Sequence, residues 1–129
     1  MSGSYLLDTN IVIGLFAHED VIITKFQQTD HAFVSSITIG ELHYGAQKSG
    51  RVQQNLDRIE RFMRKVEILS CDVATAKQYG IVKNQLRLKG RPLPENDIWI
   101  AAIALQHELI LVSRDAHFQH VENLQVVRW

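Results

Sequence analysis

The sequence predicts a three-layer α/β/α domain with a central, mainly parallel sheet. Short apolar segments alternate with longer amphipathic or apolar segments along the whole chain. This alternation of strands and helices is typical of parallel sheets with right-handed crossovers. No internal repeat, linker or low-complexity segment interrupts the pattern, so we expect residues 1–129 to form a single domain.

Five short apolar segments are the expected strands. The fourth is apolar at every position, as in a parallel strand covered on both faces. The expected strand ranges are 5–7, 32–34, 67–69, 109–112 and 124–127.

The segments between these strands have helical patterns. In residues 52–66 the apolar positions recur at spacings of three and four among many charges, which predicts a surface helix. Residues 11–16 fit either a helix or an apolar loop. We also expect helices over 36–44, with Ser36 as a candidate cap, and over 73–88.

The segment 94–105 predicts the most buried helix of the chain. Its apolar residues cover most of the helix circumference. Pro94 precedes it and Asn96 can cap its first turn, which places Asp97 near the helix N-terminus, where negative charge is favoured. A capping role alone would explain Asp97.

Four acidic residues are expected to meet at one edge of the sheet. Asp8 and Asp115 follow expected strands, whereas Glu41 and Asp97 lie in early turns of helices that begin near the same edge. Ligands of open α/β sheets bind at the carboxyl ends of the strands. Taken alone, Glu41 also fits a solvated acid on a helix surface.

Carboxylates gathered in this way repel one another unless a cation compensates their charge. Oxygen ligands suit Mg²⁺ or Mn²⁺, and no Cys or His set here suits zinc better. His117 and His120 are expected at the surface. A carboxylate-held Mg²⁺ can activate water and orient a phosphodiester, so the predicted reaction is metal-dependent phosphodiester hydrolysis.

Composition places few limits on the partner. The chain has 14 basic and 14 acidic residues, and four acids in one pocket would leave 14 basic residues against ten acidic ones elsewhere. A phosphodiester substrate is therefore compatible with zero net charge. A cluster of Lys83, Arg87, Lys89 and Arg91 fits either a polar helix end or an RNA-contacting lip.

No apolar run approaches the length of a membrane span, and no signal-peptide pattern is present, so we expect a cytoplasmic protein. Cys71 is the only cysteine, which excludes an internal disulfide and a thiolate cluster. We expect it to be packed near a strand end.

Four segments together resemble the PIN domain, and within it the VapC-type toxins of bacterial toxin–antitoxin pairs. The resemblance covers essentially the whole chain. The segments are YLLDTNI at 5–11, SSITIGELHYG at 35–45, NDIWIAA at 96–102 and VSRDAHF at 112–118.

The resemblance implies a Mg²⁺- or Mn²⁺-dependent endoribonuclease. By position in these segments, Asp8, Asp97 and Asp115 would be the metal ligands, and Glu41 would complete the catalytic site directly or through water. Asn10 and Ser113 would support the site. The resemblance also implies a homodimer inhibited by a VapB-type antitoxin.

Three other functions stay open. A PIN nuclease that processes RNA outside a toxin pair would share these residues. A phosphoacceptor or phosphatase-like fold would also place Asp8 beside Mg²⁺, although Asn10 stands where the phosphatase pattern has a second acid. A non-catalytic binding module could use the acids to hold a structural ion.

Overall fold

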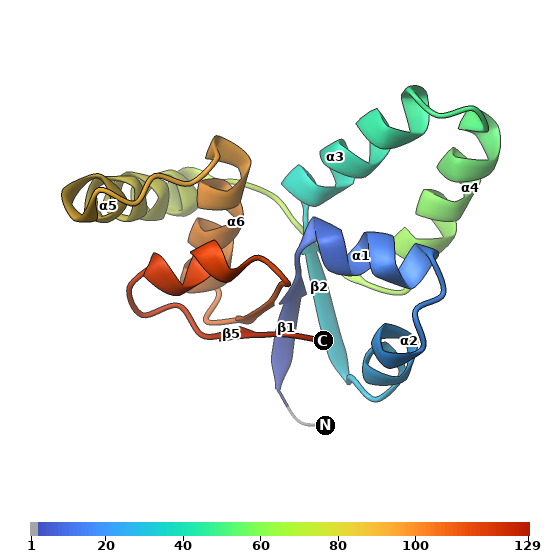
Figure 1. Ribbon diagram of the computed structural model, residues 1–129, viewed down its shortest axis with the longest axis horizontal. Helices are drawn as coiled ribbons and strands as arrows, with labels where there is room; N and C mark the ends of the chain where they lie inside the picture. The colour runs from blue at the N-terminus through green and yellow to red at the C-terminus, as the bar shows by residue number, and fades with distance from the viewer. Residues whose placement is uncertain (1–2) are drawn as a thin grey trace.

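The structure is a computed structural model that describes residues 3–129. Five parallel strands form one sheet in the order β3-β2-β1-β4-β5, so that β1 lies in the centre (Figure 1). The predicted parallel sheet is therefore confirmed, although its last strand is shorter than expected. The strands are β1 Ser4–Leu7, β2 His31–Ser35, β3 Glu67–Leu69, β4 Ile110–Val112 and β5 Val126–Val127.

Six α-helices and one 3₁₀ helix connect the strands. They are α1 Thr9–Phe16, α2 Asp20–Gln27, α3 Ser36–Gln47, α4 Val52–Met63, α5 Val73–Lys89, α6 Glu95–Gln106 and the 3₁₀ helix η1 Ala116–His120.

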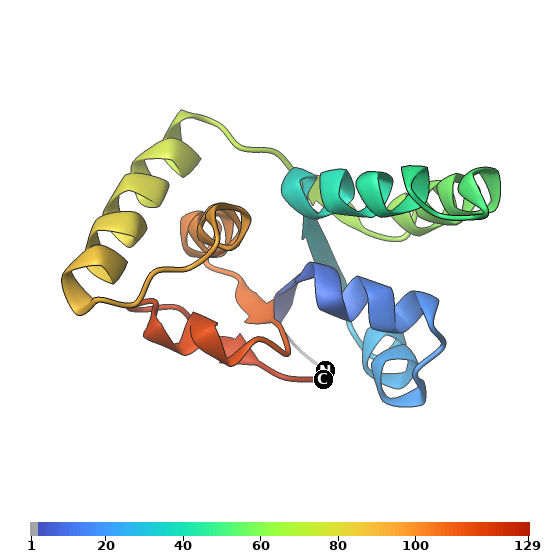
Figure 2. The same ribbon diagram turned by 45° about the horizontal axis from the view of Figure 1, so that its top comes forward.

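The direction of the crossovers decides which face each helix covers. The chain moves outward from β1 to β2 through α1 and α2, and from β2 to β3 through α3 and α4. It then returns past β1 to β4 through α5 and α6. Because parallel crossovers are right-handed, the reversal places α5 and α6 on the opposite face. Figures 1 and 2 show α1 to α4 on one side of the sheet and α5 and α6 on the other, as the three-layer prediction requires.

Each face of the sheet has its own hydrophobic core. Successive side chains of a strand point to opposite faces, so Leu6 packs with Leu86 of α5 and Ile100 of α6. Its neighbour Leu7 packs on the other side with Ile11 of α1 and a cluster from α2, α3 and α4. Both leucines are almost completely buried, which fixes β1 between the two helical layers.

Helix α6 is the buried helix that the sequence predicts. Ile98 and residues 100–104 are all buried. The expected cap is wrong, because Pro94 is the N-cap and the helix begins at Glu95. Asp97 still lies in the first turn, so the error does not move the carboxylate away from the predicted end of the helix.

Two local features differ from the predictions. Helix α2 is absent from the predictions because it has only eight residues and is separated from α1 by His18, whose backbone is left-handed (φ 59°). Cys71 is exposed, not packed, because it lies in the loop after β3 and before the capping residue of α5.

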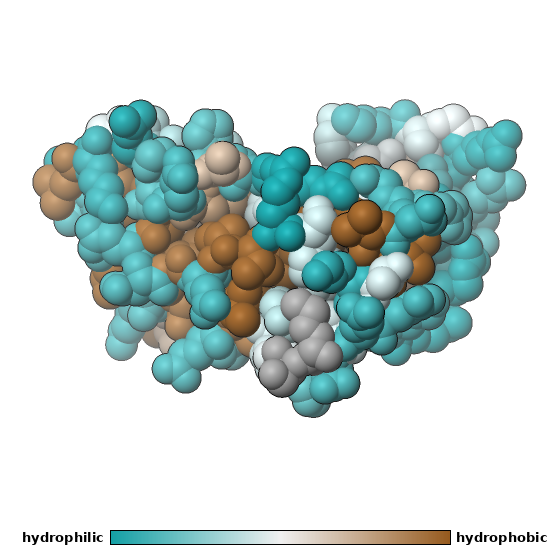
Figure 3. Space-filling view, turned by 60° about the horizontal axis from the view of Figure 1, so that its bottom comes forward, coloured by the Kyte–Doolittle hydropathy of each residue, from teal (hydrophilic) through white to brown (hydrophobic). Residues whose placement is uncertain are grey.

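The surface is mixed in character. Figure 3 shows a face on which apolar residues gather beside the start of the chain and polar residues cover most of the remainder. Among residues 3–129, no helix combines the length and the apolar character that crossing a bilayer requires.

Helix α5 offers a matched test of the second core. Leu86 is 1% exposed, whereas Leu88 of the same helix is 69% exposed. Leu86→Ala should lower the free energy of unfolding by about 2–5 kcal/mol, because it leaves a cavity against α6. Leu88→Ala should change it by less than about 0.5 kcal/mol. Urea unfolding followed by circular dichroism measures both, and equal losses would contradict this packing.

Candidate active site

The candidate site lies where the carboxyl ends of β1 and β4 meet. These strands are neighbours in the sheet, with Leu7 opposite Val112, and the crossovers leave them in opposite directions. Ligands bind at such switch points of open α/β sheets. Asp8 follows β1 directly and Ser113 follows β4 directly, so the register places these two side chains side by side.

Asp8 is held by a network of hydrogen bonds. Its Oδ2 accepts from the Ser113 hydroxyl at 2.7 Å and from Asn10 Nδ2 at 3.3 Å, and its Oδ1 accepts from the backbone N–H of Thr9 at 2.9 Å. Asn10 in turn accepts from the backbone N–H of Arg114 at 3.3 Å. The predicted supporting residues Asn10 and Ser113 therefore both contact Asp8 and fix its orientation.

The environment of Asp8 disfavours its charged form. The side chain is only 5% exposed, and this burial raises the pKa of the carboxyl. The hydrogen bonds from Ser113 and Thr9 act in the opposite direction, but the negative charges of Glu41 and Asp115 raise the pKa further. Asp8 is thus a buried acid whose negative neighbours come from two other parts of the chain.

Glu41 lies in the second turn of α3. The N-cap of this helix is Ser35, which accepts from the backbone N–H of Thr38 at 3.1 Å, so the helix begins one residue earlier than a Ser36 cap would give. The Thr9 hydroxyl donates to Glu41 Oε1 at 2.6 Å. Sequence reasoning missed Thr9, although its position directly after Asp8 was a signal that it lies at the site.

Asp97 is linked electrostatically to the other three acids. Partial burial is the main reason that its pKa is raised to about 6. The charges of Asp8, Asp115 and Glu41 raise the pKa further, and His117 opposes them. The four predicted acids, from four different segments, therefore share one electrostatic neighbourhood.

Asp115 caps the 3₁₀ helix η1. Its Oδ1 accepts from the backbone N–H of His117 at 2.9 Å and lies 2.9 Å from Nδ1 of the same residue. The backbone N–H of Asp115 donates to the Ser113 hydroxyl at 3.0 Å, and that hydroxyl also contacts Asp8. Ser113 is thus a hydrogen-bonded connection between two of the acids.

The donor set fits a hard divalent cation. The acids supply oxygen ligands, and the two with raised pKa values, Asp8 and Asp97, carry repulsion that a cation would relieve. Within residues 3–129, no three acidic, imidazole or thiol side chains stand close enough to form a ready-made chelate. Mg²⁺ commonly uses one or two carboxylates and keeps several waters, so this spacing suits it better than it suits zinc.

The basic cluster at the end of α5 is largely engaged with other protein groups. Lys83 Nζ pairs with Glu95 at 2.6 Å, and Lys89 Nζ pairs with Glu122 at 3.3 Å. Arg87 donates to Asn84 at 2.8 Å. Arg91 is exposed after the helix. An RNA-contacting role for Lys83, Arg87, Lys89 and Arg91 stays a prediction.

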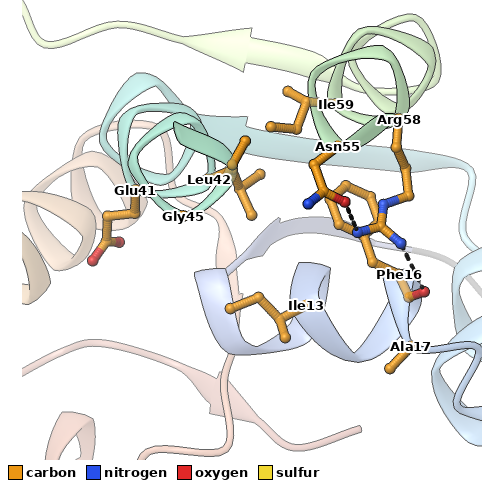
Figure 4. A pocket seen from close by; sticks show the side chains of 10 residues that line it. Ile13, Phe16, Ala17, Glu41, Leu42, Gly45, Asn55, Arg58 and Ile59 are labelled. Atoms are coloured by element: carbon orange, nitrogen blue, oxygen red, sulfur yellow. Dashed lines mark hydrogen bonds between the residues drawn. The ribbon is translucent and has the colours of Figure 1, made fainter. Parts of the chain in front are cut away.

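An apolar pocket of about 380 Å³ lies beside the site, between α1, α3 and α4. Arg58 lies over the Phe16 ring at 4.7 Å and donates to Asn55 Oδ1 at 2.8 Å. Figure 4 shows the Glu41 carboxylate on the side of α3 that points away from Arg58 and Asn55. The acid therefore faces the sheet edge and not this pocket.

Comparison with known proteins identifies the class to which this arrangement belongs. Residues 5–124 match the PIN domain family. The chain is 40% identical to Ribonuclease VapC2 of Haemophilus influenzae over 128 residues, which cover 97% of each chain. It is 32% identical, with the same coverage, to the tRNA(fMet)-specific endonuclease VapC of Shigella flexneri.

A solved structure agrees with these sequence matches. The DNA-bound VapBC complex of Salmonella typhimurium contains a chain that matches this one with a TM-score of 0.93 and 30% identity, over 99% of both chains. The protein therefore belongs to the PIN-domain family and, within it, resembles the VapC ribonucleases.

The raised pKa of Asp97 predicts how stability depends on pH without divalent cations. The folded chain binds this proton more tightly than the unfolded chain, where the pKa is about 3.9. The resulting stabilisation is complete below about pH 4 and is lost as the pH rises through about 6. Asp97→Asn should therefore exceed the wild type at pH 7.5 by about 1 kcal/mol, a value reduced for partial solvent exposure.

Urea unfolding in EDTA at pH 4.5 and pH 7.5 checks this prediction, and the advantage of the variant should be much smaller at the lower pH. Asp30→Asn removes an exposed acid in the turn before β2 and serves as the control. An advantage of the same size at both pH values would show that charge repulsion at Asp97 is not its cause.

Proposed function

We propose that this chain is a Mg²⁺- or Mn²⁺-dependent endoribonuclease and the toxin of a type II toxin–antitoxin pair. The observation that carries the proposal is the electrostatic convergence of Asp8, Glu41, Asp97 and Asp115 at the β1 and β4 edge of a PIN domain. Relatives named as ribonucleases match almost the whole chain, which supports RNA as the substrate class.

In this proposal Asp8, Asp97 and Asp115 hold the ion, and Glu41 completes the site directly or through water. The bound ion supplies activation of a water molecule and neutralisation of charge on the leaving oxygen. The protein fixes the acids. Ser113 and Asn10 orient Asp8, while the Thr9 hydroxyl orients Glu41.

The proposed protein partner is a VapB-type antitoxin. Solved neighbours at 30% and 33% identity are VapBC complexes from Salmonella typhimurium and Haemophilus influenzae. We also propose that the toxin forms a homodimer. Co-expression with the product of the neighbouring reading frame, followed by co-purification and light scattering, tests both partners.

Removal of one acid is the direct test of the nuclease. Asp8→Asn and Asp97→Asn should each lower RNA cleavage by roughly 100-fold or more, because each removes a charge that holds the ion. Asp57→Asn, on the exposed side of α4, should cleave at the wild-type rate. Because a relative is named as tRNA(fMet)-specific, tRNA(fMet) is the first RNA to assay, followed by total RNA.

The same assay separates the competing functions. Wild-type rates for Asp97→Asn in Mg²⁺ would contradict its assignment. A wild-type protein that binds RNA but never cleaves it in Mg²⁺ or Mn²⁺ would indicate a binding module. A covalent aspartyl-phosphate after incubation with acetyl phosphate would indicate a phosphoacceptor.

Metal binding should also be visible without RNA. Mg²⁺ or Mn²⁺ at about 100 times its dissociation constant should raise the free energy of unfolding of the wild type by about 2.7 kcal/mol. Asp8→Asn should lose most of this increment because it lacks a proposed ligand. Thermal unfolding at matched ionic strength measures the effect, and KCl alone is the control. Equal stabilisation of both proteins would place the ion elsewhere.

A further inference from the structure

A groove of about 800 Å³ begins at the acidic site and runs outward along α3. Its inner end includes Glu41 and the neighbours of two other acids, Thr9 beside Asp8 and Asn96 beside Asp97. Its outer end includes Tyr44 and Lys48. We call this depression the α3 groove. Its contact with α1, α3 and the start of α6 makes it continuous with the edge where the acids meet (Figure 1).

The groove-facing side of α3 presents an acid, an aromatic ring and a base in succession. Glu41, Tyr44 and Lys48 are spaced by three and four residues, so they lie along one side of the helix. At a rise of 1.5 Å per residue, Lys48 lies about 10 Å further along the helix axis than Glu41. The positive end of the groove is thus displaced from the acids along a defined path.

Tyr44 has an unusual environment for an aromatic residue. It is 67% exposed, and within residues 3–129 no other Phe, Tyr or Trp belongs to the exposed class. Lys48 Nζ lies 4.8 Å from the centroid of its ring. The ring therefore contributes to neither core, and burial in this chain does not account for its position beside the acids.

The backbone of α3 leaves space next to this ring. Gly40 and Gly45 both line the groove. A Cβ added at either glycine would meet no heavy atom within 4 Å outside its own helix backbone and chain neighbours. A flat group can therefore approach the helix surface closely between the acids and Tyr44.

We propose that the α3 groove is a nucleotide subsite, in which a base adjacent to the scissile phosphate stacks on Tyr44 and a following phosphate contacts Lys48. The inference rests on the proposed ribonuclease function and adds the residues that position its substrate. Unpaired RNA bases commonly stack on aromatic side chains, and lysines bind the backbone as point charges. Neither residue touches the reacting atoms, so both are positioning residues.

The central experiment compares Tyr44→Ala with Tyr44→Phe on an RNA that the wild type cleaves in Mg²⁺. Tyr44→Ala should lower kcat/KM roughly tenfold, mainly by raising KM, because a stacking surface is lost. Tyr44→Phe keeps the ring and should restore nearly all activity. Val21→Ala, at a 60% exposed position on α2, is the control for loss of an exposed apolar side chain.

A substrate that lacks one base shows whether Tyr44 acts through stacking. The same RNA is prepared with an abasic residue on either side of the scissile bond. At one of these positions the wild type should lose roughly as much kcat/KM as Tyr44→Ala loses on the intact RNA. Tyr44→Ala should then show no further loss on that abasic RNA, because its binding contact is already absent.

Filling the groove provides a second test that leaves the ring and the acids in place. Gly40→Leu places a side chain in the open space of the groove and should raise KM for the RNA at least roughly tenfold. Gly80→Leu makes the same change in α5, where an added Cβ also meets open space, and should leave KM unchanged. Circular dichroism of both variants checks that the helices remain folded.

The lysine is tested by salt dependence. Each lost phosphate contact to a single strand should lower the slope of log binding against log salt by about 0.7. Lys48→Gln should show this change in RNA binding, and Lys77→Gln, an exposed lysine of α5, should not. Equal slopes for both variants would remove Lys48 from the subsite.

The outcomes distinguish this inference from the proposed function. If the wild type cleaves no RNA, the proposed function fails and the subsite fails with it. If it cleaves RNA and Tyr44→Ala and Gly40→Leu match it in kcat and KM, only the subsite is overturned. If these variants instead change the oligomeric state in light scattering with unchanged KM, the α3 groove is a protein contact and not an RNA subsite.

Discussion

Electrostatic repulsion among the acids at the β1 and β4 edge is the constraint on which the site depends. Asp8 and Asp97 both have raised pKa values because burial and neighbouring negative charge act together. A chain tolerates such an arrangement only where the backbone holds the acids in place. Here Asp8 follows the central strand of the sheet, whose leucines are fixed in two separate cores.

The topology explains why acids from remote segments meet. Reversal of the crossover direction brings β4 next to β1 and sends α3 and α6 to opposite faces of the same edge. Glu41 and Asp97 then approach Asp8 from different sides. The hydrogen bonds of Ser113 and Thr9 join elements that are distant in sequence, so the site is held by tertiary contacts and not by a local motif.

The sequence predicted the sheet and the burial of α6 because these depend on apolar patterns that the cores impose. It predicted the convergence of the acids because position after a strand determines position at the sheet edge. It failed for the cap of α6 and for Cys71, where alternative local contacts decide the outcome. It could not predict that Lys83 and Lys89 pair with Glu95 and Glu122, because those contacts require the packed fold.

The acids and the α3 groove depend on different parts of the fold. The acids come from four segments, and a change in any of those segments disturbs the sheet edge or a core. Tyr44 and Lys48 come from the exposed side of one helix and pack in neither core. Substitutions there have little effect on folding. If the groove positions RNA, as we propose, substrate choice can change on α3 while the arrangement of the acids is kept.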